Sequence, residues 1–329
     1  MEFERVIVGH ERQKMQLLQD IALKKLAHAY LFCGKEHLGK FTIAKWFAGE
    51  VLTDGQTEEE KRHAMKIMKK NIHPDLLILD QLWIADVCTD WSIIARSSNI
   101  AQEERAKKKV RTNTIGIDDV RELQRRLHET AQTGRLCCLI RSLERLNAEA
   151  ANALLKILEE PPPHVLFCCT TASLSSLPAT IVSRMRVLEF SPLSLQELEP
   201  LLSSFSEEDC SLLLTIAQGS PGIIFRSLED PDALRGLRQL HINAHRFLEG
   251  DSGIERFRKL ASALEEGQEK ALICHLLLHL GESLRSTDLP TVERALHLSR
   301  QLLSLLSSLH LNPQRPLLAA HFVLQSSLT

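Results

Sequence analysis

The segment around one glycine-rich loop constrains the fold more than any other part of this sequence. A short apolar run at residues 29–33 leads into Gly34-Lys35-Glu36-His37-Leu38-Gly39-Lys40, and residues 42–51 then carry apolar side chains at helical spacing. Buried strand, glycine loop and helix form the arrangement that a phosphate-binding loop requires, because the glycines let backbone amides converge on anionic oxygens. We expect Gly34, Gly39 and Lys40 to be the nucleotide-contacting residues of this loop.

The residues that would hold Mg²⁺ beside such a loop are missing. Phe41 stands where a Ser or Thr hydroxyl is needed. Thr42 comes one residue late, and one residue on a helix turns a side chain by about 100°. The second predicted strand, residues 136–140, ends in Arg141-Ser142 in place of metal-binding carboxylates. We therefore expect a nucleotide fold that does not hydrolyse nucleotide, and we assign no metal residue.

The sequence leaves nucleotide binding itself open. Loop amides and Lys40 can hold phosphates without a metal, so residual ATP or ADP binding is compatible with the pattern. No cofactor is required, and no Mg²⁺-dependent hydrolysis is expected. Glu144 lies beyond the end of the second strand, and we interpret its carboxylate as a helix-start or surface charge.

Strands and helices alternate through the first part of the chain. Apolar runs at residues 29–33, 136–140 and 165–169 predict three buried strands, and the helices between them predict an α/β layer with a parallel sheet. Asn147 is placed to cap a helix over residues 148–160. Beyond residue 192 helices dominate. The predicted domains are a nucleotide-fold domain at 1–190, a small helical domain at 191–234 and an all-α domain at 235–329.

Two apolar stripes at helical spacing are expected to face a core. The first lies within residues 10–26 and comprises Met15, Leu18, Ile21, Ala22 and Leu26. The second lies near the end of the chain and comprises Ala295, Leu298, Leu302, Leu305 and Leu309.

Composition limits the partners. Lys and Arg number 40 against 42 Asp and Glu, so the whole-molecule charge does not favour binding to a nucleic-acid backbone. We interpret the basic run at residues 105–111 as a solvated loop, with a DNA-facing loop as the alternative. The eight cysteines favour buried thiols in a reducing compartment over a disulfide framework. No stretch has the length of a membrane span, so we expect a cytoplasmic protein without membrane contact.

Several short motifs, in order from about residue 6 to residue 230, resemble the clamp-loader subunits of bacterial DNA polymerase III, an AAA+ family. The resemblance is closer to delta-prime subunits than to the ATP-hydrolysing gamma/tau subunits. The motifs are His28-Ala29-Tyr30-Leu31-Phe32, His73-Pro74-Asp75-Leu76, Leu146-Asn147-Ala148-Glu149-Ala150-Ala151-Asn152-Ala153-Leu154-Leu155-Lys156, Leu158-Glu159-Glu160-Pro161-Pro162, Leu177-Pro178-Ala179-Thr180-Ile181-Val182-Ser183-Arg184 and Gly219-Ser220-Pro221-Gly222.

The resemblance implies a fold and a role. The fold is an AAA+ parallel-sheet domain followed by a helical lid and a helical collar. The role is that of a subunit in a ring that uses ATP to load a sliding clamp onto primed DNA, beside a gamma/tau-like motor subunit and a delta-like subunit. A delta-prime-like chain hydrolyses nothing itself and presents a Ser-Arg-Cys element to ATP on the neighbouring motor subunit.

The resemblance also assigns residues. The Ser-Arg-Cys element matches Ser183-Arg184-Met185, which implies Arg184 as an arginine finger acting in trans, with Ser183 beside it. The four-cysteine zinc module of these families would lie between the glycine loop and the second strand, where only Cys88 occurs. No zinc is therefore expected.

Other functions stay open at this point. The chain would be an active AAA+ ATPase if Thr42 and Glu144 served as atypical metal ligands. It would be a DNA-binding module if the basic run at residues 105–111 bound the phosphate backbone of DNA. For Arg184, the alternative is an ordinary ion pair with a surface carboxylate such as Glu189.

Overall fold

The computed structural model describes residues 7–69, 73–79, 114–128, 131–249, 252–266, 269–284, 288–308 and 322. The chain divides into two compact units. Unit 1 comprises Met1–Pro200 and Gly219–Gly222, and unit 2 comprises Leu201–Gln218 and Ile223–Thr329. The basic run at 105–111 and Cys88 lie outside the described residues. The division into three domains at residues 190 and 234 stays a prediction.

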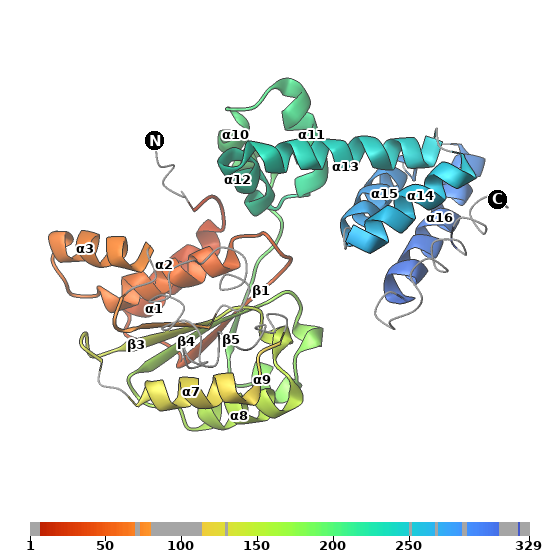
Figure 1. Cartoon of the computed structure of the whole chain (residues 1–329). Helices are drawn as coiled ribbons and strands as arrows, with labels where there is room; N and C mark the ends of the chain where they lie inside the picture. Colours follow the sequence, from red (N-terminus) through yellow and green to blue (C-terminus); the bar gives the residue numbers. More distant parts are fainter. Residues whose placement is uncertain are drawn as a thin grey trace. The chain divides into compact units, whose positions relative to one another are not determined.

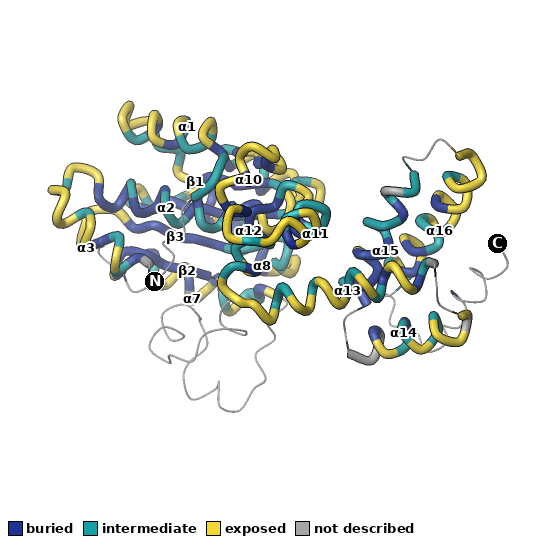
Figure 2. Tube along the Cα trace, turned by 90° about the horizontal axis from the view of Figure 1, so that it is seen from above, coloured by how far each residue is buried: buried dark blue, intermediate teal, exposed yellow. Residues whose placement is uncertain are grey.

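Unit 1 is built on a five-stranded parallel sheet with the order β2-β3-β4-β1-β5. Its strands are β1 (Ala29–Cys33), β2 (Leu76–Leu79), β3 (Leu136–Ile140), β4 (Val165–Thr171) and β5 (Arg186–Glu189). Every residue of the first four strands is buried, which explains their nearly continuous apolar sequence. Figure 2 shows these strands as buried segments.

Helices cover both faces of the sheet in unit 1 (Figure 1). One face carries α1 (Glu11–Ala22), α2 (Lys40–Leu52) and α3 (Glu58–Lys69). The other carries α7 (Ile117–Leu127), α8 (Ala148–Glu159) and α9 (Ala179–Val182). Short 3-10 turns occur at Leu143–Arg145 and Leu174–Ser176, and α10 (Leu195–Leu202) comes after β5. The α/β layer expected from the sequence is confirmed.

The sequence analysis missed two strands and assigned one helical face correctly only in part. β2 is apolar throughout but only four residues long, and β5 is a partly exposed edge strand that contains Arg186 and Glu189. In α1, Met15 and Leu18 are 60% and 43% exposed, while Leu17 is fully buried. Ile21 and Leu26 pack partly buried against the core as predicted, and Asp20 also turns inward, where it pairs with Arg186 and Tyr30.

Unit 2 is helical throughout its described residues. Its helices are α11 (Glu207–Ala217), α12 (Pro221–Glu229, whose first two residues group with unit 1), α13 (Pro231–Glu249), α14 (Gly253–Glu266), α15 (Glu269–Ser283) and α16 (Leu289–Ser308). The core contains Ala295, Leu302 and Leu305 with Leu298 partly buried beside them, as the sequence predicts. Leu309 lies outside the described residues.

The cysteines fall into two groups. Cys33, Cys137, Cys138, Cys168 and Cys169 are buried in strands as free thiols. Burial raises the pKa of the thiols at 137, 138, 168 and 169 and makes them poor nucleophiles. Cys274 departs from the expectation because it is exposed, and Cys210 is half-buried. Among the described residues, no helix combines the length and apolar character that membrane crossing needs.

Candidate functional site

The glycine loop occupies the carboxyl edge of the sheet. In the parallel register, Cys33 at the end of β1 lies opposite Thr171 and Glu189, so the loop that follows β1 sits beside the ends of β4 and β5. Gly34 and Gly39 have φ angles of 151° and 85°, values that favour glycine because an L side chain is strained there. The structure thus brings Gly34, Gly39 and Lys40 together at the N-terminus of α2, as the sequence predicts for these three residues.

Several backbone carbonyl groups of the glycine loop form hydrogen bonds with other residues of the chain. The Lys40 ammonium donates to the carbonyl oxygens of Gly34 and Lys35, at 2.5 Å each. The Gly222 amide donates to the carbonyl of His37 at 2.8 Å, and His10 Nε2 lies 3.0 Å from the carbonyl of Leu38. Leu38 is itself buried in the core. The loop is therefore held from several sides by residues of unit 1.

Lys40 is only 9% exposed. Burial lowers its pKa below the ordinary lysine value, and the nearby carboxylate of Glu144 opposes this effect. Glu144 lies in the first turn of the 3-10 helix Leu143–Arg145, in agreement with the helix-start interpretation, but it is half-buried and not a surface charge. Its Oε1 accepts a hydrogen bond from the Ala172 amide at 3.3 Å, and its Oε2 is shielded from solvent without a hydrogen-bond partner among the described residues.

The two positions where a metal would be held face each other. The guanidinium carbon of Arg141, which follows β3, lies 5.5 Å from the centre of the Phe41 ring at the start of α2. This distance suits a cation–π contact. The described residues contain no group of three or more His, Cys, Asp or Glu side chains arranged to hold a metal ion.

Two of the sequence motifs have structural roles near this edge. Asp75 is buried and accepts hydrogen bonds from the amides of Gln132 and Thr133, which fixes the turn before β3. Gly222 lies against the glycine loop, where an added Cβ would come within 2.8 Å of the His37 carbonyl oxygen. Glycine is therefore required at 222 by the close approach of two backbones.

Arg184 lies on the other side of the sheet from α2, after α9. Its NH1 donates to the carbonyl of Thr180 at 2.8 Å and to Ser183 Oγ at 3.4 Å. Its NH2 donates to Glu159 Oε1 at 2.7 Å. The ion partner is therefore Glu159, at the end of α8, and not Glu189, which the sequence analysis gave as an example.

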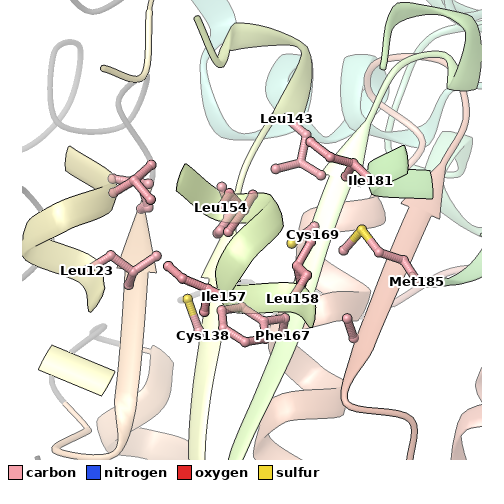
Figure 3. Close-up of a cluster of buried hydrophobic side chains, with 14 of the residues drawn as sticks. Leu123, Cys138, Leu143, Leu154, Ile157, Leu158, Phe167, Cys169, Ile181 and Met185 are labelled. Atoms are coloured by element: carbon pink, nitrogen blue, oxygen red, sulfur yellow. The ribbon is translucent and has the colours of Figure 1, made fainter. Parts of the chain in front are cut away.

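The segment that carries Arg184 is anchored by its neighbours. Met185, which stands where the resembling families have cysteine, is buried in the same cluster as Ile181 and Leu158 (Figure 3). Ser183 is exposed, and Arg184 is one-third exposed, with 34% of its side-chain surface open to solvent. Met185 thus replaces the cysteine as a buried anchor, while Arg184 keeps solvent access.

A family model described as "DNA polymerase III, delta subunit" matches residues 9–194, more than half of the chain. The chain belongs to this DNA polymerase III delta-subunit family. The match covers the glycine loop, β3 and Arg184, so the site described above lies within the family's shared region.

Individual relatives agree with this membership. The delta' subunit of Pseudomonas aeruginosa is 32% identical over 206 residues, which cover 59% of this chain and 54% of the relative. The delta' subunit of Escherichia coli is 37% identical over 114 residues, or 33% of this chain and 34% of the relative. The tau subunit of Bacillus subtilis is 28% identical over 220 residues, or 66% of this chain and 34% of the relative.

These comparisons confirm the resemblance to delta-prime clamp-loader subunits. The chain spans about a third to about half of the length of the curated relatives that it matches first. Within this DNA polymerase III family member, sequence reasoning missed the Glu159 partner of Arg184 and the bond between Gly222 and the loop. Both residues lie in motifs that carried the resemblance, but motif matching alone does not reveal which side chains meet.

Proposed function

We propose that this chain is a non-hydrolysing stator subunit of the DNA polymerase III clamp loader. It helps to load the sliding clamp onto primed DNA as part of a cytoplasmic complex with a gamma/tau-like motor subunit and a delta-like subunit. In this complex it supplies Arg184, with Ser183 beside it, to ATP bound by the neighbouring motor subunit.

The contact between Phe41 and Arg141 supports the proposal that this chain does not hydrolyse ATP. A phosphoryl-transfer site needs Mg²⁺ bridging the terminal phosphates, held by a loop hydroxyl and a strand carboxylate. Here an apolar ring takes the place of the hydroxyl and a cation takes the place of the carboxylate. A cation repels Mg²⁺, so the cis site has neither the ligands nor the charge for hydrolysis.

Two features of Arg184 support its proposed role as an arginine finger acting in trans. It is partly exposed on an anchored segment, and it occupies the position that the family resemblance gives to the trans-acting arginine. A guanidinium at a neighbour's γ-phosphate neutralises charge as the bond breaks. No cofactor is required for this role, and any ATP or ADP that the glycine loop retains is held without Mg²⁺-dependent hydrolysis. We propose neither a zinc site nor any other metal site.

The α16 helix supports assembly through the C-terminal helices. Leu289, Leu296 and Leu303 are exposed at intervals of seven residues, so they form a stripe separate from the buried stripe at Ala295, Leu302 and Leu305. An apolar stripe on a helix that already packs its other face favours a helical neighbour. We propose that residues 235–329 act as the collar that joins the ring.

Phosphate release by the isolated chain tests the non-hydrolysing half directly. Wild type and Lys40→Ala should both release phosphate at the background rate, with or without Mg²⁺, because Phe41 and Arg141 replace the loop hydroxyl and the strand carboxylate. A turnover of about 1 s⁻¹ or more, which is an ordinary enzyme rate, contradicts the proposal if it disappears in Lys40→Ala. In that outcome the chain is an active ATPase with atypical metal ligands.

A further inference from the structure

Glu159 lies at the end of a firmly placed helix. α8 starts at the Asn147 cap, whose side chain accepts a hydrogen bond from the Ala150 amide at 2.8 Å. Leu158, the residue before Glu159, is buried in the core, and Pro161 follows shortly after. Proline cannot donate the backbone bond that would continue the helix, so the helix ends here. The Glu159 carboxylate is therefore projected from a rigid support.

The local structure of α8 gives Glu159 no reason to be acidic. The last turn of a helix carries partial negative charge, which disfavours a carboxylate and favours a cation. The Glu159 side chain is 43% exposed, so its ion pair with Arg184 adds little to the stability of the fold. The contact with Arg184 is the compensating interaction that the structure offers at this position.

Some N–H donors of the Arg184 guanidinium bind residues of this chain, and the others are available to bind a phosphate. A guanidinium has five N–H donors. Three contacts use them within the described residues, to Thr180, Ser183 and Glu159. Two donors are left without a partner among the described residues, and a fork of two donors is what bidentate recognition of a phosphate needs.

From this geometry we infer that Glu159 is a positioning residue for Arg184. The inference rests on the proposed trans-acting role of Arg184. Glu159 holds one corner of the guanidinium from α8, while Thr180 and Ser183 hold another from the α9 segment. Because the long arginine side chain is ordered before assembly, less conformational freedom is lost when it meets the neighbour's phosphate.

Glu160 provides a matched control within the same motif. It is an adjacent glutamate, exposed like Glu159, and it has no ion pair or side-chain hydrogen bond among the described residues. Replacing it changes the net charge of the segment by the same amount as replacing Glu159. Any effect of the Glu159 variants that Glu160→Ala lacks is therefore specific to the contact with Arg184.

The experiment measures single-turnover ATP hydrolysis at the adjacent motor site in a reconstituted ring. Glu159→Ala should slow the hydrolytic step about 3- to 30-fold, the range expected when one long side chain must be ordered anew. Glu159→Gln keeps the size of the side chain and an acceptor oxygen, and it should fall between Glu159→Ala and wild type. Glu160→Ala should match wild type, and the ATP concentration for half-saturation should be unchanged in all three.

A double substitution separates positioning from a general structural effect. In an Arg184→Ala ring, adding Glu159→Ala should cause no further loss, because Glu159 acts through the guanidinium. An equal loss in both backgrounds overturns the inference, as does a wild-type rate for both Glu159→Ala and Glu159→Gln. If the Ala variant fails to assemble, the Gln variant decides alone. A wild-type rate for Arg184→Ala itself refutes the proposed function, which is a distinguishable outcome.

Discussion

The guanidinium of Arg141 lies over the ring of Phe41, with 5.5 Å between the guanidinium carbon and the ring centre. These residues come from different elements, one after β3 and the other at the start of α2. In an ATPase of this fold the same two places would hold Mg²⁺ through a carboxylate and a hydroxyl. Their mutual contact supports the proposal that this chain does not hold Mg²⁺ at these two places.

This contact predicts that nucleotide binding, where it is measurable, does not depend on Mg²⁺. Wild-type affinity for ATP should change by less than about twofold between Mg²⁺ and a chelator, because no protein ligand engages the metal. The double substitution Phe41→Thr with Arg141→Asp restores a hydroxyl and a carboxylate, and it should make affinity Mg²⁺-dependent. Calorimetric titration of both proteins checks this. Strong Mg²⁺ dependence in the wild type would contradict the account of the cis site.

A histidine cluster in unit 2 predicts a pH dependence of stability. His275 on α15 is buried beside His241, with 6.0 Å between the ring centres, and the ring of His279 stacks on His241 at 4.2 Å. Burial, with a smaller contribution from these two neighbours, lowers the pKa of His275 to about 4 from an ordinary value of 6.5. The neutral ring is thus favoured in the folded state.

The sign of the effect follows from proton binding. Between pH 6.5 and 4 the unfolded chain binds a proton at His275 that the folded chain does not, so stability is complete above pH 6.5 and falls as the pH drops toward 4. We expect a loss of roughly 1–3 kcal/mol over this window after allowance for solvent screening. Urea unfolding of unit 2 should show a flatter pH profile for His275→Gln. The exposed control His297→Gln should keep the wild-type slope, and an identical slope in all three proteins refutes the prediction.

The exposed stripe on α16 predicts a separation between folding and assembly. Leu296→Asp with Leu303→Asp should change the free energy of unfolding by no more than about 1 kcal/mol, because the two residues are 41% and 51% exposed. The same protein should lose co-elution with the motor subunit during size-exclusion chromatography. Glu293→Ala, a substitution at another exposed residue of α16, is the control and should co-elute normally. Full-strength co-elution of the double variant would exclude this face of α16 from the collar.

Periodicity and burial made the large features of the fold predictable. The run at 136–140 is apolar throughout because β3 is buried on both faces, and the Asn147 cap followed from residue type alone. β2 was missed because its apolar run is only four residues long, and β5 was missed because it is an edge strand with two charged residues among four. The helix α1 was predicted, but its buried face only in part, because the inward position of Asp20 depends on a partner distant in sequence.

The site was predictable as a list of positions and not as a set of contacts. Gly34, Gly39 and Lys40 follow from loop chemistry, since glycine geometry and helix termini are local properties. Glu144 was placed correctly at a helix start, but its burial was missed because its neighbours, Lys40 at the start of α2 and Ala172 after β4, are distant in sequence. Long-range pairs such as Glu159 with Arg184 require the tertiary structure.

Single-turnover hydrolysis and clamp loading by a reconstituted ring test the central claim most directly, with wild type compared with Arg184→Ala. The account predicts intact folding and assembly, with hydrolysis at the one adjacent motor site reduced by about 10³- to 10⁵-fold, or roughly 4–7 kcal/mol. Arg184→Lys should not restore the rate, because lysine lacks the planar fork. A surface ion pair would change the rate hardly at all, being worth about 0–1 kcal/mol. If the Ala variant hydrolyses ATP and loads clamps at the wild-type rate, Arg184 is an ordinary surface arginine and the trans-acting role is wrong.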